Sequence, residues 1–143
     1  MNFWDSSAIV ALIADEPLAP VARRVLEADE RMAAWWGTSV ECVAAVARQE
    51  RDAGIDVDRA AELLRRLDAL AAQWYEVSPG RRIKVIARRL LRVHPLKAAD
   101  ALQLAAAVAV AEDGPGLIGF VSFDARLNEA AGREGFNLVR SQG

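Results

Sequence analysis

The sequence has few of the residues that mark several large classes of protein. Its 143 residues include a single cysteine, Cys42, and a single histidine, His94. One cysteine cannot form an internal disulfide, and one Cys with one His does not make a zinc site. A single His also gives no secure Ser-His-Asp triad, and the chain has no glycine-rich loop of the kind that binds phosphate groups. Disulfide and zinc chemistry are therefore not expected.

Long hydrophobic runs and a strong net charge are also missing. The longest apolar run, residues 104–111, is far shorter than the roughly 20 residues that a membrane helix needs. The first residues carry no basic segment of the kind that opens a secretory signal peptide. The formal net charge of −2 argues only weakly against a nucleic-acid binder, because a local basic face can coexist with an acidic site. We expect a cytoplasmic protein that does not bind a membrane.

Hydrophobic residues make up 53% of the chain, so one domain spanning residues 1–143 can bury a substantial core. Short apolar segments typical of buried strands alternate with segments of helical periodicity. The expected strands are residues 2–4, 32–36, 74–77, 117–123 and 136–139. Strands that alternate with helices favour a parallel sheet covered on both faces. We predict an α/β fold, a three-layer αβα sandwich with a short-stranded, mostly parallel central sheet.

Four acidic residues lie where strands give way to helices or inside an apolar helix. Asp5 ends the first expected strand, and Asp124 ends the strand expected over 117–123. Glu41 lies in the first turn of the helix that follows the second strand, and Asp100 lies early in a nearly all-apolar helix. The ends of parallel strands and the starts of the helices that follow share one edge of the sheet, where ligands bind. We expect the four acids at this edge.

Each acid also has an ordinary structural interpretation. Asp5 and Asp124 could be helix N-caps, Glu41 could favour the helix dipole or form a capping box, and Asp100 could pair with an Arg or Lys. As a group, however, they would repel, because like charges about 4 Å apart cost roughly 4 kcal/mol at an effective dielectric near 20. One or two Mg²⁺ or Mn²⁺ ions would neutralise such a cluster, bind phosphate oxygens and lower the pKa of a bound water.

The four acids lie in short motifs that follow one another along nearly the whole chain. The motifs are Asp5-Ser6-Ser7-Ala8, Thr38-Ser39-Val40-Glu41, Ala99-Asp100-Ala101-Leu102-Gln103-Leu104-Ala105 and Val121-Ser122-Phe123-Asp124-Ala125-Arg126-Leu127. In this order and spacing the sequence resembles the PIN-domain family, specifically the VapC-type toxins of bacterial toxin–antitoxin systems. It departs from the family pattern in a short first strand that carries Trp4 and in Ser6, where Thr is common after the first acid.

The resemblance implies an endoribonuclease that depends on Mg²⁺ or Mn²⁺ and leaves 5′-phosphate and 3′-hydroxyl ends. The metal would be bound by Asp5, Glu41, Asp100 and Asp124, and Ser6 and Ser122 would support the site by hydrogen bonds. With Asp5 on the metal, we expect Ser6 and Ser7 to cap the first helix instead.

The resemblance also implies partners: an RNA substrate, a cognate antitoxin that keeps the toxin inactive, and a second copy of the chain in a homodimer. Candidates for the antitoxin groove are Leu12, Ile13, Val25 and Leu26, although each also fits a plain core position.

The main basic feature of the chain is the segment 81–92, which predicts a helix. Its candidate RNA-binding residues are Arg81, Arg82, Lys84, Arg88 and Arg89. The residues at 81, 84 and 88 share one face, and such a stripe can follow a phosphate backbone, although a solvated helix face explains it equally well. Trp35 and Trp36 could stack on bases, but two Trp in a buried strand favour the core.

Two other functions fit the same residues. A PIN-like domain could bind RNA or protein without cutting, and the complete set of four acids favours an enzyme over this alternative. A nuclease with the same metal site could instead act on DNA or a small phosphate ester, and the sequence leaves this open. The sequence does not identify the RNA that would be cut.

Overall fold

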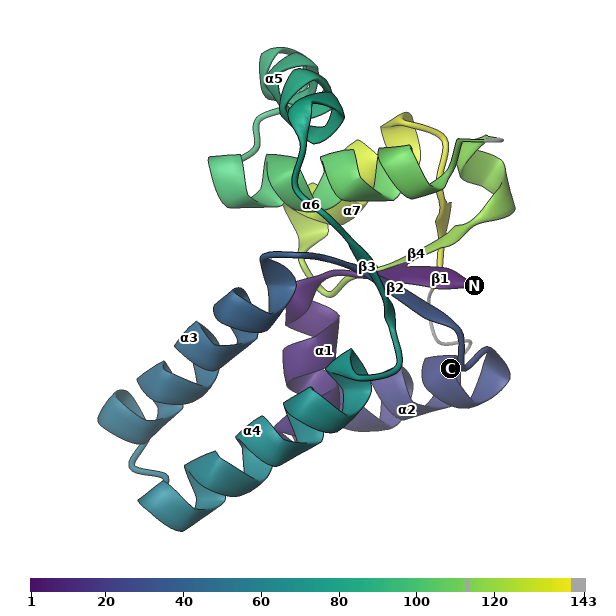
Figure 1. Ribbon diagram of the computed structural model, residues 1–143. Coiled ribbons are helices and arrows are strands. Elements are labelled where there is room, and N and C mark those ends of the chain that lie inside the picture. Colours follow the sequence, from purple (N-terminus) through teal and green to yellow (C-terminus); the bar gives the residue numbers. More distant parts are fainter. Residues whose placement is uncertain (113, 140–143) are drawn as a thin grey trace.

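The computed structural model describes residues 1–112 and 114–139, so part of the domain expected over 1–143 lies outside the described residues. Strands and helices follow one another as shown in Figure 1. The elements are β1 (Asn2–Trp4), α1 (Ser6–Ile13), α2 (Ala19–Ala28), β2 (Met32–Trp35), α3 (Thr38–Asp52), α4 (Val57–Ala71), β3 (Tyr75–Val77), α5 (Arg81–Val93), α6 (Ala98–Val110), the 3₁₀ turn η1 (Pro115–Leu117), β4 (Gly119–Val121), α7 (Ala125–Arg133) and β5 (Asn137–Leu138).

Within the described residues the sheet has five strands in the order β3-β2-β1-β4-β5, and every pair is parallel. The central strand is β1, in which Phe3 lies opposite Ala33 of β2 and Phe120 of β4. The chain first builds outward from β1 to β3 and then returns to add β4 on the other side of β1. The order therefore reverses between β1 and β4, the position at which open α/β sheets bind ligands.

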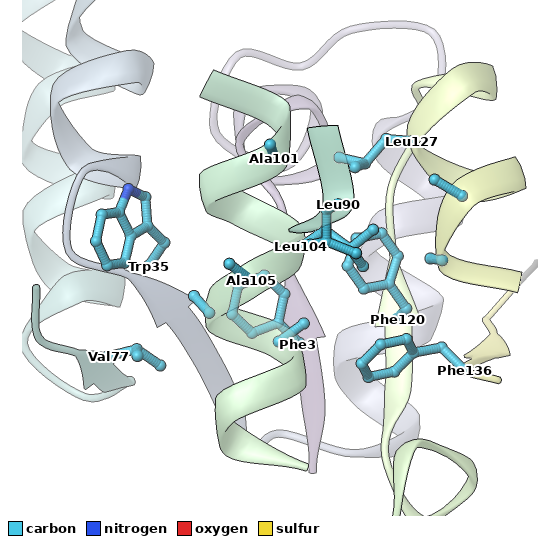
Figure 2. Packing of buried hydrophobic residues seen from close by; sticks show 14 of the residues in the cluster. Phe3, Trp35, Val77, Leu90, Ala101, Leu104, Ala105, Phe120, Leu127 and Phe136 are labelled. Carbon is cyan, nitrogen blue, oxygen red and sulfur yellow. The ribbon is translucent and has the colours of Figure 1, made fainter. Parts of the chain in front are cut away.

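Helices cover both faces of the sheet, with α5, α6 and α7 on one side and α1 to α4 on the other (Figure 1). Successive strand residues point to opposite faces, so Phe3 packs in the cluster under α6 while Trp4 packs in the cluster under α1 and α4. Figure 2 shows Phe3 and Phe120 beneath α6; their rings stack with centroids 5.8 Å apart. The predicted three-layer fold is confirmed.

The structure differs from the sequence-based expectation in several details, among them the strands expected over 32–36, 74–77 and 136–139, which are one or two residues shorter. The sheet, expected to be mostly parallel, is parallel throughout its described strands. The strand expected over 117–123 is shorter, because Pro115–Leu117 forms a 3₁₀ turn and the ladder ends at Val121. None of the helices in the described residues combines the length and the apolar character that a membrane span requires.

Candidate active site

Asp5 follows β1 directly and is almost fully buried, with 2% of its surface exposed. Its extended backbone places it at the N-cap of α1, where Oδ1 accepts a hydrogen bond from the backbone N–H of Ser7. Its other oxygen, Oδ2, accepts a hydrogen bond from the hydroxyl of Ser122. The prediction that Ser6 and Ser7 would cap α1 is therefore wrong. Both serines already lie inside the first turn, whereas Asp5 has the extended conformation typical of an N-cap.

Two serine hydroxyls join the β1–α1 junction to the β4–α7 junction. Ser7 Oγ accepts a hydrogen bond of 2.9 Å from the backbone N–H of Phe123, and it lies 3.4 Å from Ser122 Oγ. Ser122 Oγ donates to Asp5 and accepts a bond of 3.0 Å from the backbone N–H of Asp124. The two strand ends at which the sheet order reverses are thus fixed to each other.

Ser122, which the resemblance implied as a supporting residue, contacts Asp5 directly. Ser6 lines a neighbouring groove, and within the described residues it is Ser7 whose hydroxyl bonds across the site. The sequence analysis missed this role of Ser7. The available signal was its place in the first turn of α1, beside the end of β1.

Asp124 occupies the N-cap of α7, as its ordinary interpretation suggested. Its Oδ1 accepts a hydrogen bond of 3.0 Å from the backbone N–H of Leu127. The loop before it is fixed by Asn128, whose amide donates a bond of 2.8 Å to the carbonyl oxygen of Ser122. Capping and a place at the site are therefore compatible, because the N-cap of a helix that follows a parallel strand lies at the ligand-binding edge.

Glu41 lies in the first turn of α3 and is half-buried. Gln103 of α6 donates from Nε2 to Glu41 Oε2 and also to the hydroxyl of Thr38, at 2.9 Å. Gln103 is 1% exposed, and among the described residues its Oε1 has no hydrogen-bond partner. The sequence analysis did not identify Gln103 or Thr38. A signal existed, since Gln103 is a polar residue in the same apolar helix that drew attention to Asp100.

The pKa values of three of the acids are raised. Burial raises the pKa of Asp5 despite the hydrogen bonds from Ser122 and Ser7 that lower it. Burial also raises the pKa of Glu41, opposed by the Gln103 hydrogen bond and reinforced by the charges of Asp5 and Asp100.

For Asp100, burial is again the main cause of a raised pKa. The charge of Asp124 raises it further, while Lys97 lowers it. These repulsions connect all four acids: Glu41 with Asp5 and Asp100, and Asp100 with Asp124. A positive charge placed among them would therefore be stabilised.

The donor atoms suit a hard divalent cation, because the four carboxylates and the serine hydroxyls beside them supply only oxygen. In the described residues, however, no three Asp, Glu, His or Cys side chains are grouped closely enough to bind a metal ion as they stand. Glu41 is engaged by Gln103 and Asp124 by the start of α7. The residues fit Mg²⁺ or Mn²⁺ by their chemistry, and a shared ion would require the carboxylates to come closer together.

A groove of about 800 Å³ opens beside this edge, between α1 and α3. Ser6, Ser7 and Glu41 line its inner end, and Arg48 lies further along α3. The place of Arg48 in the groove brings a cation onto the same face of α3 as Glu41.

Two of the residues considered for an antitoxin groove belong to the core. Ile13 and Val25 are buried in the cluster beneath α1 and α2, whereas Leu12 and Leu26 are partly buried against it. The plain core interpretation therefore holds for Ile13 and Val25.

The basic helix α5 has two different faces. Arg82 forms an ion pair with Glu112, and Arg89 forms one of 2.9 Å with Glu134. Arg81, Lys84 and Arg88 instead line a second groove, of about 810 Å³, with Trp35 and Leu102. RNA binding by this helix stays a prediction.

The two adjacent tryptophans have different environments. Trp35 is a core residue, 7% exposed, as expected. The same expectation is wrong for Trp36, which is 52% exposed, because β2 ends at Trp35 and the next side chain leaves the sheet.

The fold and the acidic edge, which carries Asp5, Glu41, Asp100 and Asp124, together define a class of protein. It is a parallel α/β domain with carboxylates where the strand order reverses. Residues 3–133 match the family model of the PIN domain. This chain belongs to the PIN-domain family.

Solved structures with similar folds cover nearly all of the chain. FitAcB from Neisseria gonorrhoeae has a TM-score of 0.67 at 16% identity, covering 98% of this chain and 97% of that one. VapC20 from Mycobacterium tuberculosis, named as a toxin that cleaves the sarcin–ricin loop, has a TM-score of 0.64 at 20% identity, covering 99% and 100%. PAE2754 from Pyrobaculum aerophilum has a TM-score of 0.62 at 22% identity, covering 90% and 83%. At these identities the likeness concerns the fold. A comparison with curated protein sequences found no match.

Proposed function

We propose that this chain is an endoribonuclease toxin that depends on Mg²⁺ or Mn²⁺ and hydrolyses RNA phosphodiester bonds. The observation that carries the proposal is the coupling of four acids at the edge where the sheet order reverses. Burial raises the pKa values of Asp5, Glu41 and Asp100. Repulsion adds to this effect at Glu41, from the charges of Asp5 and Asp100, and at Asp100, from the charge of Asp124. A protein gains no stability from such a cluster, so a cationic cofactor explains it better than a structural role.

Membership of the PIN-domain family and the fold shared with VapC20, which is named as a toxin that cleaves the sarcin–ricin loop, support the choice of RNA. In the same proposal a small antitoxin protein binds the toxin and keeps it inactive, and the active form is a homodimer.

Asp5, Glu41, Asp100 and Asp124 would bind one or two ions. A bound ion would supply positive charge for the phosphate oxygens and lower the pKa of the attacking water. The residues around the four acids hold the carboxylates in place. Ser122 and Ser7 hold the Asp5 carboxylate in one orientation through both of its oxygens.

Gln103 holds Glu41 by Oε2, which leaves Oε1 as the oxygen that can take a proton from the attacking water.

The proposal is tested by incubating the purified chain with RNA and with DNA of the same sequence, with and without Mg²⁺. Cleavage of RNA that leaves 5′-phosphate ends supports it. Preferential cleavage of DNA would mean that the substrate is DNA rather than RNA. No cleavage of either polymer at any metal concentration would favour a PIN domain that binds without cutting. Sequencing RNA ends after brief expression in cells would then identify the target.

The antitoxin part of the proposal has its own test. A small protein encoded beside this chain should copurify with it and suppress cleavage when both are expressed. Full activity of the copurified pair would remove this part and leave the nuclease intact.

A further inference from the structure

The start of α5 breaks the usual rules for a helix N-terminus. Helices α1, α4 and α7 begin with an Asp whose side chain caps the first turn. Helix α5 begins after Gly80 with no side-chain cap, as α2, α3 and α6 also do, but its first two residues are Arg81 and Arg82. Cations at this end of a helix are disfavoured by the helix dipole. Such local conflicts are expected where a binding function competes with stability.

The cations of α5 divide by face. On one face Arg82 pairs with Glu112 and Arg89 pairs with Glu134, so their charges are satisfied within the protein. On the other face, Arg81, Lys84 and Arg88 form no ion pair with any of the described residues. These three side chains, together with the uncapped start of α5, concentrate positive charge on one surface.

The groove beneath this face borders α6, the helix that carries Asp100 and Gln103. Besides the three cations it is lined by Trp35, at the end of β2, and by Leu102 of α6. Leu102 lies between Asp100 and Gln103, so the same helix borders the groove and supplies the site. Beside the groove, Trp36 exposes half of its surface and makes an edge contact with Trp35, with ring centroids 6.4 Å apart.

We propose that Arg81, Lys84 and Arg88 bind the phosphate backbone of single-stranded RNA along this groove, with Trp36 as a stacking surface for one base. This inference rests on the proposed function and deepens it, because it names the path of the substrate on this chain and the residues that hold it. An exposed indole stacks on bases of any identity once they are unpaired, and the bases of a duplex already stack on each other. Backbone contacts from cations carry most of the affinity of such complexes.

A second copy of this chain fits the groove less well. In a two-fold dimer the same patch is used by both copies, so a dimer built on this groove would bring two sets of Arg81, Lys84 and Arg88 into one interface. Like charges at such a contact repel, whereas a phosphate backbone neutralises them.

The test compares two double variants that remove the same charge from the same helix. In the full chain carrying Asp5→Asn to prevent cleavage, binding of a single-stranded RNA oligonucleotide is measured at several salt concentrations. Lys84→Gln with Arg88→Gln should weaken binding by about tenfold or more. It should also flatten the slope of log affinity against log salt by roughly 1.4, which corresponds to two lost backbone contacts. Arg82→Gln with Arg89→Gln, the matched control, should leave the slope unchanged.

Trp36→Ala should weaken binding of the single strand by about tenfold while leaving the salt slope as it was, because stacking releases no counterions. Thermal unfolding of each variant establishes that it is folded, and light scattering reports its oligomeric state.

Equal losses in the two double variants would overturn the inference, as would the absence of RNA binding by the parent protein. A change of oligomeric state with unchanged RNA binding would show that a second copy occupies the groove and would overturn it too. Failure of the proposed function is distinct: the wild-type chain would then bind RNA with the predicted face preference but would not cleave it with Mg²⁺.

Discussion

The acidic edge and the basic helix α5 treat their charges in opposite ways. At the edge, carboxylates are held by donors from within the protein: Asp5 by Ser7 and Ser122, and Glu41 by Gln103. On the groove face of α5, the described residues provide no ion-pair partner for the cations. The physical reason is burial, because a buried carboxylate needs hydrogen bonds whereas an exposed cation is satisfied by water. The arrangement at the edge therefore fixes the geometry of the carboxylates, whereas the groove face of α5 offers its cations to an external partner.

The largest effect is expected when the edge loses one charge. Asp5→Asn keeps the shape of the side chain, and its amide can still bond to Ser7 and Ser122. Cleavage should fall by about a thousandfold or more, which corresponds to losing roughly 4 kcal/mol of transition-state stabilisation. The measurement is the initial rate of RNA cleavage, with thermal unfolding as the test of folding.

Asp56→Asn is the matched control, because Asp56 is also an Asp N-cap but serves α4, away from the edge. Asn caps helices as well as Asp does, so this variant should retain full activity. A fully active Asp5→Asn protein would remove Asp5 from the metal site.

Removal of divalent cations should abolish activity reversibly. Excess EDTA should reduce cleavage to background, and added Mg²⁺ or Mn²⁺ should restore it, because the edge repels its own charges without a cation. Zn²⁺, which prefers nitrogen and sulfur donors, should restore it less well. Cleavage that persists unchanged in EDTA would contradict the mechanism.

A smaller effect is expected at the residue that holds Glu41. Gln103→Leu keeps the volume but removes both donated hydrogen bonds, so Glu41 loses its orientation. Affinity for Mn²⁺, measured by calorimetry, should fall by about 10- to 100-fold. Thr38→Val removes only the second acceptor of Gln103 and leaves its bond to Glu41, so it should change Mn²⁺ affinity much less. Equal losses in both variants would mean that Gln103 acts through packing rather than through Glu41.

The smallest effect is expected on the ion-paired face of α5, the face of Arg82 and Arg89. There the Glu134 carboxylate is hydrogen-bonded to Arg89 and His94. Burial raises the pKa of Glu134, but the hydrogen bonds from Arg89 and His94 and the charge attraction to them together lower it by more, so its pKa lies below the usual 4.5. A lowered pKa in the folded state stabilises the protein above pH 4.5, and this contribution is lost as the pH falls through the lowered value.

Glu134→Gln should therefore reduce the free energy of unfolding by about 1 kcal/mol at pH 7. The difference from wild type should shrink below pH 4.5, as measured by urea unfolding at each pH. A difference that grows as the pH falls would contradict the assigned direction of the pKa shift.

Much of the fold could be predicted because its signals are local. The buried strand before Asp5, the alternation of strands with helices and the apolar character of α6 are all readable within about ten residues. Both ends of β4 were misjudged because Ile118 before it and Phe123 after it are apolar. Apolar character does not show where the hydrogen-bonded ladder starts and stops.

The candidate site was predictable in its four acids and, through the family resemblance, in Ser122 as a supporting residue. Asp5, Glu41, Asp100 and Asp124 stand out because they interrupt apolar segments at element boundaries. The contacts that hold these acids do not stand out: Ser122 reaches Asp5 across 117 positions of sequence, Ser7 reaches Phe123 across 116, and Gln103 reaches Glu41 across 62. A single sequence carries no signal for contacts at such separations.

Short-range periodicity is enough to predict the order of strands and helices and the acids that follow them. Tertiary packing settles how charges are distributed among partners. It assigned Asp5 rather than Ser6 or Ser7 to the cap of α1, and it exposed Trp36 beside a buried Trp35. It also separated Arg82 and Arg89, which are ion-paired, from the cations that line the groove. Whether a side chain is satisfied within the protein depends on which distant element packs against it, and that is settled only when the sheet assembles.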